Sequence, residues 1–356
     1  MRRQHLERAL RLALSLALGG LLAWVLTHGG LPMLPAGSAF AAVRPWTVVL
    51  YALSLALMHY LRAVRWRHLL RPIAPVPTRR VLATAFIGFA AILFLPLRMG
   101  EVVRPLLLGR RGPVRAWQAA GTVAAERVID ALALALVLLF AVELTPHLEP
   151  LPDHVGELAL PVAAVPATAR VAVGVFASVL VAMMIFYATR ARSERLVRRV
   201  FGVVSPRLGE RLAGVVARLA EGIAFLPQRR HLVPFLLETA AYWLVNALGL
   251  WLLAWGTGLD VVGPGEACTI MGVLGIGILL PAGPAFVGAF QLAVYLALAM
   301  YLPPDEVPAR GAAFVFLAYG CQLAQHAVGA AIGYALDRGD ARGGAPRPAE
   351  AREHGA

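Results

Sequence analysis

The sequence contains no lysine: all 33 basic residues of the 356-residue chain are arginine. This absence excludes lysine nucleophiles and Schiff-base chemistry. Cysteine is scarce as well. Cys268 and Cys321 both lie in apolar segments without CxxC or Cys/His ligand spacing, so we interpret them as packing residues and expect no metal site. The HExxH, GxSxG and P-loop motifs are also missing, so we expect no cofactor, and an ATP-driven mechanism would need a partner protein.

Charged residues of either sign are few. They make up 15% of the chain, against roughly 25% in soluble globular domains. Hydrophobic residues make up 59%, and the mean hydropathy is +0.71. Apolar runs of about 20 residues recur, each long enough to cross ~30 Å of hydrocarbon. The composition predicts an all-α polytopic membrane protein with a single membrane domain over residues 1–336.

Eight apolar segments follow one another along the chain. Six of them predict full transmembrane helices: residues 10–27, 46–63, 117–142, 168–188, 231–256 and 310–336. The other two, 81–109 and 267–301, are interrupted by prolines. The first segment resembles a signal peptide followed by a cleavage-like Ala39-Phe40-Ala41, but its apolar run exceeds the usual 7–15 residues, so we interpret it as a retained helix.

Arginine is distributed very unequally between the loops. The termini and the loops on one side hold 27 of the 33 arginines, and the opposite loops hold three. Because cytoplasmic loops are rich in arginine, we predict an inner-membrane protein with both termini in the cytoplasm. The same rule explains the net charge of +13 without nucleic acid as a partner. This topology requires 81–109 to return to the cytoplasm and 267–301 to return to the outside, so we predict two oppositely oriented re-entrant hairpins.

The predicted topology contains an inverted repeat, with span–hairpin–span units at about 46–142 and 231–336. Inverted repeats with broken helices are typical of transporters, whose substrate sites lie near the midplane between the halves. Between the units, 190–228 predicts an amphipathic segment on the cytoplasmic leaflet or, alternatively, a polar connector with a packed stripe. The polar composition of 337–356 predicts a disordered cytoplasmic tail.

Six charged residues fall inside the first hairpin and the span after it: Arg98, Glu101, Arg104, Glu126, Arg127 and Asp130. Their spacing of three or four residues within each segment places them near one helix face. Because buried charges need partners, we predict a neutral cluster of three arginines and three acids. The cluster either binds an anionic head group, since arginine binds phosphate with two donors, or only locks the hairpin, and both roles are compatible.

Helix-breaking residues and isolated polar groups mark further candidate positions. Hinge or gating roles are predicted for Pro96, Gly100, Pro281, Gly283, Pro284, Gly288 and Gln291. Glu238 is a further polar group inside a predicted span, and His326 is a candidate proton relay. For the amides Asn246, Gln322 and Gln325, interhelical hydrogen bonds are favoured over a functional role. At the end of the predicted span 46–63, Arg62, Arg65 and Trp66 predict an anchor for anionic lipid at the cytoplasmic interface, unless they only determine topology.

Four stretches resemble the lysylphosphatidylglycerol synthase transmembrane family, also called flippase-like membrane domains. They are "RAVRWRHLL" (62–70), "LPLRMGEVVRPLLLGRR" (95–111), "TVAAERVIDALAL" (122–134) and "PAGPAFVGAFQ" (281–291). The second and third follow the family pattern P-x-R-x-G-E-x-x-R and then E-R-x-x-D. The fourth departs from it, with Ala285 and Phe286 where members often carry glycine and Gln291 where many carry an acid. The resemblance covers roughly residues 10–336.

The resemblance implies that the protein moves a polar lipid across the bilayer. Relatives that synthesise the lysyl-lipid carry a soluble aminoacyl transferase domain, which this sequence lacks, so we expect no synthase activity. The predicted partners are membrane lipids with an anionic head group, and lipid-pathway enzymes are further candidates. Two alternatives stay open: a non-transporting factor of an envelope or hopanoid pathway, and an intramembrane head-group transferase, which would need a nucleophile or metal near Glu126 or Asp130.

Overall fold

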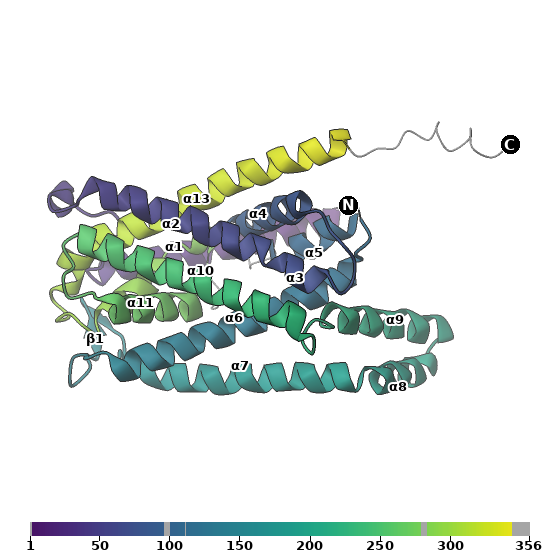
Figure 1. Ribbon diagram of the computed structural model, residues 1–356. Coiled ribbons are helices and arrows are strands. Elements are labelled where there is room, and N and C mark those ends of the chain that lie inside the picture. Colours follow the sequence, from purple (N-terminus) through teal and green to yellow (C-terminus); the bar gives the residue numbers. More distant parts are fainter. Residues whose placement is uncertain (1, 96–99, 111, 279–282, 344–356) are drawn as a thin grey trace.

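A computed structural model describes residues 2–95, 100–110, 112–278 and 283–343. The described chain is largely helical, and several of its long helices run roughly along one axis (Figure 1). The first part of the chain forms α1 (Arg2–His28), η1 (Gly37–Phe40), α2 (Pro45–Val64), α3 (Trp66–Leu70), α4 (Thr78–Phe94), α5 (Gly100–Arg110) and α6 (Ala116–Leu144). A short unpredicted β-hairpin follows, made of β1 (His154–Val155) and β2 (Leu158–Ala159).

The second part of the chain continues with α7 (Ala164–Ala188), α8 (Arg190–Gly202), α9 (Pro206–Gly222), α10 (Arg229–Gly256), α11 (Pro264–Gly277), η3 (Pro284–Phe286), α12 (Ala289–Leu298) and α13 (Val307–Gly343). Helix α13 runs past the predicted end at 336, so a disordered tail starting at 337 is wrong for its first residues. Residues 344–356 of that tail lie outside the described part of the chain.

Four helical stretches of the described chain are long and apolar enough to cross a membrane: Pro45–Leu70, Ala164–Ala188, Arg229–Gly256 and Val307–Arg338. They coincide with four of the six predicted spans. The other two predicted spans fall in α1 and α6. Helix α6 has 29 residues, but Glu126, Arg127 and Asp130 interrupt its apolar sequence. Whether α1 and α6 also cross the bilayer stays a prediction.

Each proline-interrupted segment consists of two helices that pack against one another, α4 with α5 and α11 with α12. Gly100 permits the first pairing, because a side chain there would collide with the backbone of Ala91 and Ile92. In the second segment, the amide of Gly288 donates 2.9 Å to the side-chain oxygen of Gln291, which caps the start of α12. The predicted hinge residues Pro96 and Pro281 lie outside the described residues, and re-entry into the membrane stays a prediction.

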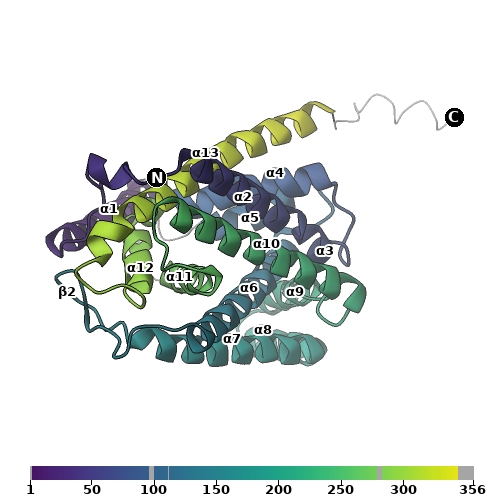
Figure 2. The same cartoon turned by 60° about the vertical axis from the view of Figure 1, so that its left-hand side comes forward.

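The helices of the two predicted units interlock. The first helices of both units, α2 and α10, pack side by side (Figure 1). Helix α4 packs on α13, and α11 packs on α6, so each broken segment lies against the last helix of the other unit. In Figure 2, α11 is seen nearly end-on between α10 and α6. Both units therefore contribute helices to the walls of the space between them.

Helix α1 covers the break in the second broken segment. Gly19 and Gly283 approach so closely that a side chain on Gly283 would stand 2.5 Å from the Cα of Gly19. Gly288 has φ of 81° and lies against Leu22. Its backbone angle lies in the left-handed region that favours glycine. The predicted hinge positions Gly283 and Gly288 thus serve a backbone contact with α1.

The segment 190–228 is not one amphipathic helix but two, α8 and α9, separated near Ser205 and Pro206. The two pack against each other, and α9 also packs on α6, where Gly121 and Gly222 allow close backbone contact. Helix α8 has no buried residue. Helix α9 therefore fits the predicted alternative, a connector whose stripe of side chains packs on the protein, better than it fits a helix lying on the membrane surface.

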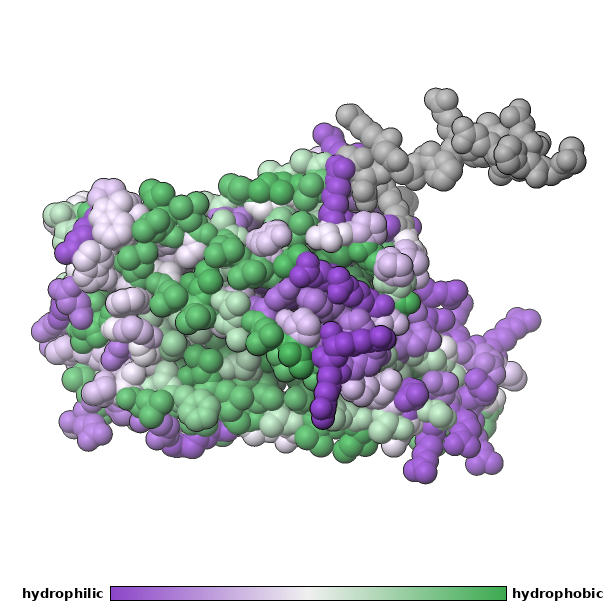
Figure 3. Space-filling model, viewed as in Figure 1, coloured by the Kyte–Doolittle hydropathy of each residue, from purple (hydrophilic) through white to green (hydrophobic). Residues whose placement is uncertain are grey.

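The molecular surface separates polar from apolar side chains. Figure 3 shows an apolar band and, at the end that carries α8 and α9, a dense group of hydrophilic side chains. The start of α1 and the end of α13 also lie toward this end (Figure 1). The predicted arginine-rich loops are therefore gathered at one end of the molecule.

Candidate functional site

A cluster of buried charges forms where α3, α5, α6 and α10 meet. At its centre, the guanidinium of Arg65 donates to Asp130 at 2.7 Å, to Glu126 at 3.2 Å and to the Thr239 hydroxyl at 2.6 Å. Arg65 and Glu126 are fully buried, and Asp130 is 6% exposed. The two acids share one face of α6 because they are four residues apart. Arg65 thus joins α6 to α10.

Arg104 of α5 forms the predicted pair with α6. Its Nη1 donates to Glu126 Oε1 at 3.2 Å, and its Nη2 lies 3.0 Å from Glu126 Oε2. Arg127 adds a third guanidinium, with Nη2 2.6 Å from Glu126 Oε1 and 3.5 Å from Asp130 Oδ2. Three arginines therefore converge on Glu126, and two of them also contact Asp130.

Aromatic rings enclose the buried guanidinium groups. Arg104 lies over the Trp66 ring at 4.2 Å from its centroid and over Phe89 at 5.1 Å. Arg65 lies over Phe235 and Tyr242 at 4.8 and 4.6 Å. Such cation–π contacts favour a positive charge that has lost its water. Room for Arg104 comes from Gly88 of α4, where any side chain would overlap the Arg104 methylenes.

The structure corrects the prediction of a lipid anchor at Arg65 and Trp66. Both are fully buried, and the indole of Trp66 donates to Thr122 at 2.9 Å. Neither side chain is placed to contact lipid head groups. The burial of Arg65 could have been inferred from the sequence, because Arg62 and Arg65 are three residues apart and continue one face of the preceding apolar helix. Arg98, the predicted cluster member, lies outside the described residues.

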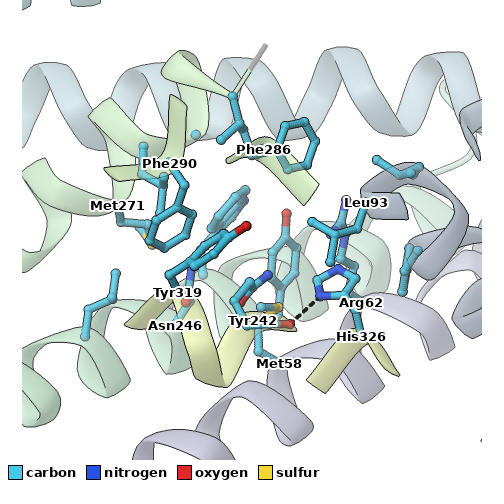
Figure 4. Close-up of a pocket in the computed structure, with 18 of the residues that line it drawn as sticks. Met58, Arg62, Leu93, Tyr242, Asn246, Met271, Phe286, Phe290, Tyr319 and His326 are labelled. Carbon is cyan, nitrogen blue, oxygen red and sulfur yellow. Dashed lines mark hydrogen bonds between the residues drawn. The ribbon is translucent and has the colours of Figure 1, made fainter. Parts of the chain in front are cut away.

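A cavity of about 130 Å³ opens between the two units beside this cluster. Figure 4 shows Arg62 of α2, Tyr242 and Asn246 of α10, and Tyr319 and His326 of α13 around it. Arg62 stacks over Phe89 at 4.5 Å, and its Nε is buried without a hydrogen-bond partner among the described residues. The residues that line this cavity include no carboxylate.

A second cavity, of about 290 Å³, lies next to the first. The two share Arg62, Trp243, Gly275 and Ile278 as wall residues. The second cavity is also lined by Glu101, Arg127 and Asp130, so it reaches the charge cluster directly. Arg62 stands at the boundary between the two spaces. With Arg62 and Arg65, the described cluster and cavities contain four arginines and three acids. The predicted neutral balance includes Arg98 and stays a prediction.

The other predicted polar residues divide between the cavity and separate contacts. Asn246, Gln322 and His326 line the first cavity. Glu238 instead binds Arg67 at 2.8 Å and His68 at 3.2 Å, near the start of α10. The sequence analysis did not identify His59, which contacts His326 in the structure. Only its spacing of three residues from Arg62 on the same helix could have indicated a role for His59.

These apolar helices define a multi-pass membrane protein. A family model described as the lysylphosphatidylglycerol synthase TM region matches residues 9–328, and the chain therefore belongs to this family. The match covers the transmembrane region and indicates a role connected with membrane lipids. No curated protein and no solved structure matches the chain.

Proposed function

We propose that the protein moves an anionic, phosphate-bearing lipid across the cytoplasmic membrane, with the head group bound beside Arg62. The observation that carries this proposal is Arg62 itself. It lines both cavities, and among the described residues no carboxylate lies within ion-pair distance of it. A buried guanidinium without a counter-ion is costly. A phosphate in the cavity would supply that counter-ion with two parallel hydrogen bonds.

The neighbouring cluster supports an anion rather than a cation as the substrate. The described cluster and cavities hold four arginines against three acids, so the local field favours negative charge. Glu126 and Asp130 are both engaged by arginines. This arrangement favours binding over a head-group transferase, which would need one of these carboxylates as a base for a nucleophile.

An apolar cavity of about 300 Å³ offers space for an acyl chain. It is lined by residues of α1, α6, α7, α11 and α12 and shares Ile276 with the second cavity. A lipid could therefore place its head group near Arg62 and one chain among apolar side chains. The interlocked pairs α4–α13 and α6–α11 support alternating access by movement of one unit against the other. We place the arginine-rich end in the cytoplasm.

The test is translocation of fluorescent phosphatidylglycerol in proteoliposomes, followed by chemical quenching of the outer leaflet. We expect Arg62→Gln to weaken binding of the anionic lipid about ten- to a hundredfold, because one charged hydrogen-bonding group is lost. Translocation at subsaturating lipid should fall by a similar factor. Folding should persist, since Arg62 makes no ion pair with the described residues.

The matched control is Arg79→Gln, which removes the same charge from an exposed position at the start of α4. It should translocate like the unaltered protein. Equal rates for Arg62→Gln and Arg79→Gln, with both proteins monodisperse, would rule out the assigned head-group site. Absence of translocation by the unaltered protein would rule out the transport function.

A further inference from the structure

Two buried histidines from different units face each other at the wall of the first cavity. Nε2 of His59 on α2 lies 3.4 Å from Nε2 of His326 on α13, with the rings perpendicular and their centroids 4.6 Å apart. The residues are 2% and 7% exposed. Neither belongs to the charge cluster, and His326 lines the cavity that contains Arg62.

The hydrogen bonds of the other ring nitrogens fix where the protons are. Nδ1 of His59 lies 2.9 Å from the Leu55 carbonyl, and Nδ1 of His326 lies 2.8 Å from the Gln322 carbonyl. A carbonyl only accepts, so both Nδ1 atoms must carry hydrogen. In the neutral rings, both Nε2 atoms are then acceptors, and two lone pairs face each other. One added proton would turn this contact into an N–H···N hydrogen bond.

The surroundings place a positive charge beside this contact. Phe89 of α4 packs on His59, at 6.0 Å between ring centroids, and also carries Arg62 on its ring. Arg62 acts electrostatically on both histidines. The titratable or charged groups around the pair are Arg62 and Tyr51 from α2, Arg104 from α5 across Phe89, Tyr242 from α10, and Tyr319 and Cys321 from α13. Helix α4 adds no titratable group to this wall.

We propose that His59 and His326 form a binding site for one shared proton, which is taken up together with the anionic head group beside Arg62. This inference rests on the proposed function and supplies its coupling ion. Without the anion, a proton on the pair would add a second buried positive charge next to Arg62. With the anion present, the two charges compensate each other. By linkage, the proton must in turn strengthen binding of the anion.

The position of the pair connects proton binding to movement of the units. His59 lies in the first unit and His326 in the second, so the shared proton draws α2 and α13 together. Loss of the proton restores two facing lone pairs and loosens that contact. A monoanionic lipid and one proton carry no net charge, so the coupled movement should respond to a pH gradient and not to membrane potential.

The first experiment measures the steady-state distribution of fluorescent phosphatidylglycerol in proteoliposomes with an imposed pH gradient. One coupled proton allows a gradient of one pH unit to sustain up to about tenfold lipid asymmetry. A potassium–valinomycin potential should leave the asymmetry unchanged. His59→Gln and His326→Gln should abolish it, and the control His28→Gln, at an exposed histidine of α1, should retain it.

The second experiment measures proton uptake on lipid binding. Short-chain phosphatidylglycerol is added to the purified protein in weakly buffered detergent with a pH dye, and short-chain phosphatidylcholine serves as the comparison. We expect proton uptake with the anionic lipid only, lost in the His59→Gln, His326→Gln double variant. Translocation that ignores the gradient, without proton uptake, would overturn this inference and leave the transport function standing. Proton uptake without translocation would support the proton site and contradict the transport function.

Discussion

Glu126 accepts contacts from three arginines, and its neighbour Asp130 accepts from two of them. The single negative charge of Glu126 is therefore shared by three buried or half-buried guanidinium groups. Removing one member of a buried ion-pair network leaves uncompensated charges in a medium that cannot solvate them. The stability of the site should depend on this residue more than on any one of the arginines.

We expect Glu126→Gln to lower the free energy of unfolding by about 3–5 kcal/mol, because three arginines would lose the carboxylate that they share. Chemical unfolding in mixed micelles, followed by circular dichroism, measures the change. The control on the same helix is Glu143→Gln, whose pair with Arg170 is exposed and should contribute less than about 1 kcal/mol. Similar midpoints for the two variants would show that the cluster does not hold these helices together.

At the scale of single residues, the sequence predicted part of this cluster. The spacing within α5 and α6 placed Arg104 and Glu126 among the clustered charges, and the need of buried charges for partners joined the two segments, but the specific pair follows only from the packing of the helices. Arg65 was misplaced because an arginine beside tryptophan at the end of an apolar run also fits an interface anchor. Only the packing of α3 against α6 and α10 decides between the two, and that packing is a long-range property.

At the scale of elements, the break between α11 and α12 contains two residues with unfavourable backbone angles. Ala285 has φ of 58° and Phe286 has φ of 56°, in the left-handed region. Side chains in that region cost roughly 1–2 kcal/mol relative to glycine. The hydroxyl of Tyr319 donates to the Ala285 carbonyl at 3.0 Å and helps to hold this conformation.

Ala285→Gly should therefore raise the free energy of unfolding by about 1 kcal/mol, since glycine adopts the observed angles without strain. The measurement is the unfolding midpoint in detergent. Ala182→Gly, at an exposed position within α7, is the opposite control and should lower stability by about 1 kcal/mol. A loss of stability in both variants would contradict the backbone conformation of the break.

The sequence predicted the positions of some helices and turns better than those of others. Prolines and glycines indicated the helix breaks in 81–109 and 267–301, because these residues act locally on the backbone. Pro105 is an exception, since it lies inside α5 and does not end it. The segment 190–228 was predicted as one element, since α8 and α9 share an amphipathic pattern that continues through the turn between them. The β-hairpin of two-residue strands is too short to leave a periodic signal.

At the scale of the whole molecule, the gathering of arginine at one end leads to a prediction about orientation. We replace Cys268 and Cys321 by serine and introduce either Ser38→Cys in η1 or Arg211→Cys in α9. The two positions are exposed, and η1 and α9 lie toward opposite ends of the molecule (Figure 1). In intact bacterial cells, a membrane-impermeant maleimide should label Ser38→Cys only, because α9 should lie in the cytoplasm.

Permeabilised cells provide the control, since both cysteines should then react. Labelling of Arg211→Cys but not Ser38→Cys in intact cells would show the opposite orientation and contradict the proposed cytoplasmic position of the arginine-rich end. Labelling of both would contradict a membrane barrier between the two ends.

The arrangement of the helices in space was the least predictable feature. Charge counting suggested two units, but nothing in either unit indicates that α4 packs on α13 and α11 on α6. Neither the cavities nor the histidine pair could be foreseen without those contacts, because His59 and His326 are brought together by tertiary packing alone. Periodicity describes one helix at a time and carries no information on its neighbours.

The backbone contact between Gly19 and Gly283 also has a consequence for the timing of synthesis. The two glycines are separated by about 260 residues, which a ribosome needs on the order of tens of seconds to translate. During this interval, α1 has left the ribosome but the surface that receives it does not yet exist. The first helix to be made is therefore among the last to settle, and insertion factors that shield nascent helices have that whole interval in which to act on it.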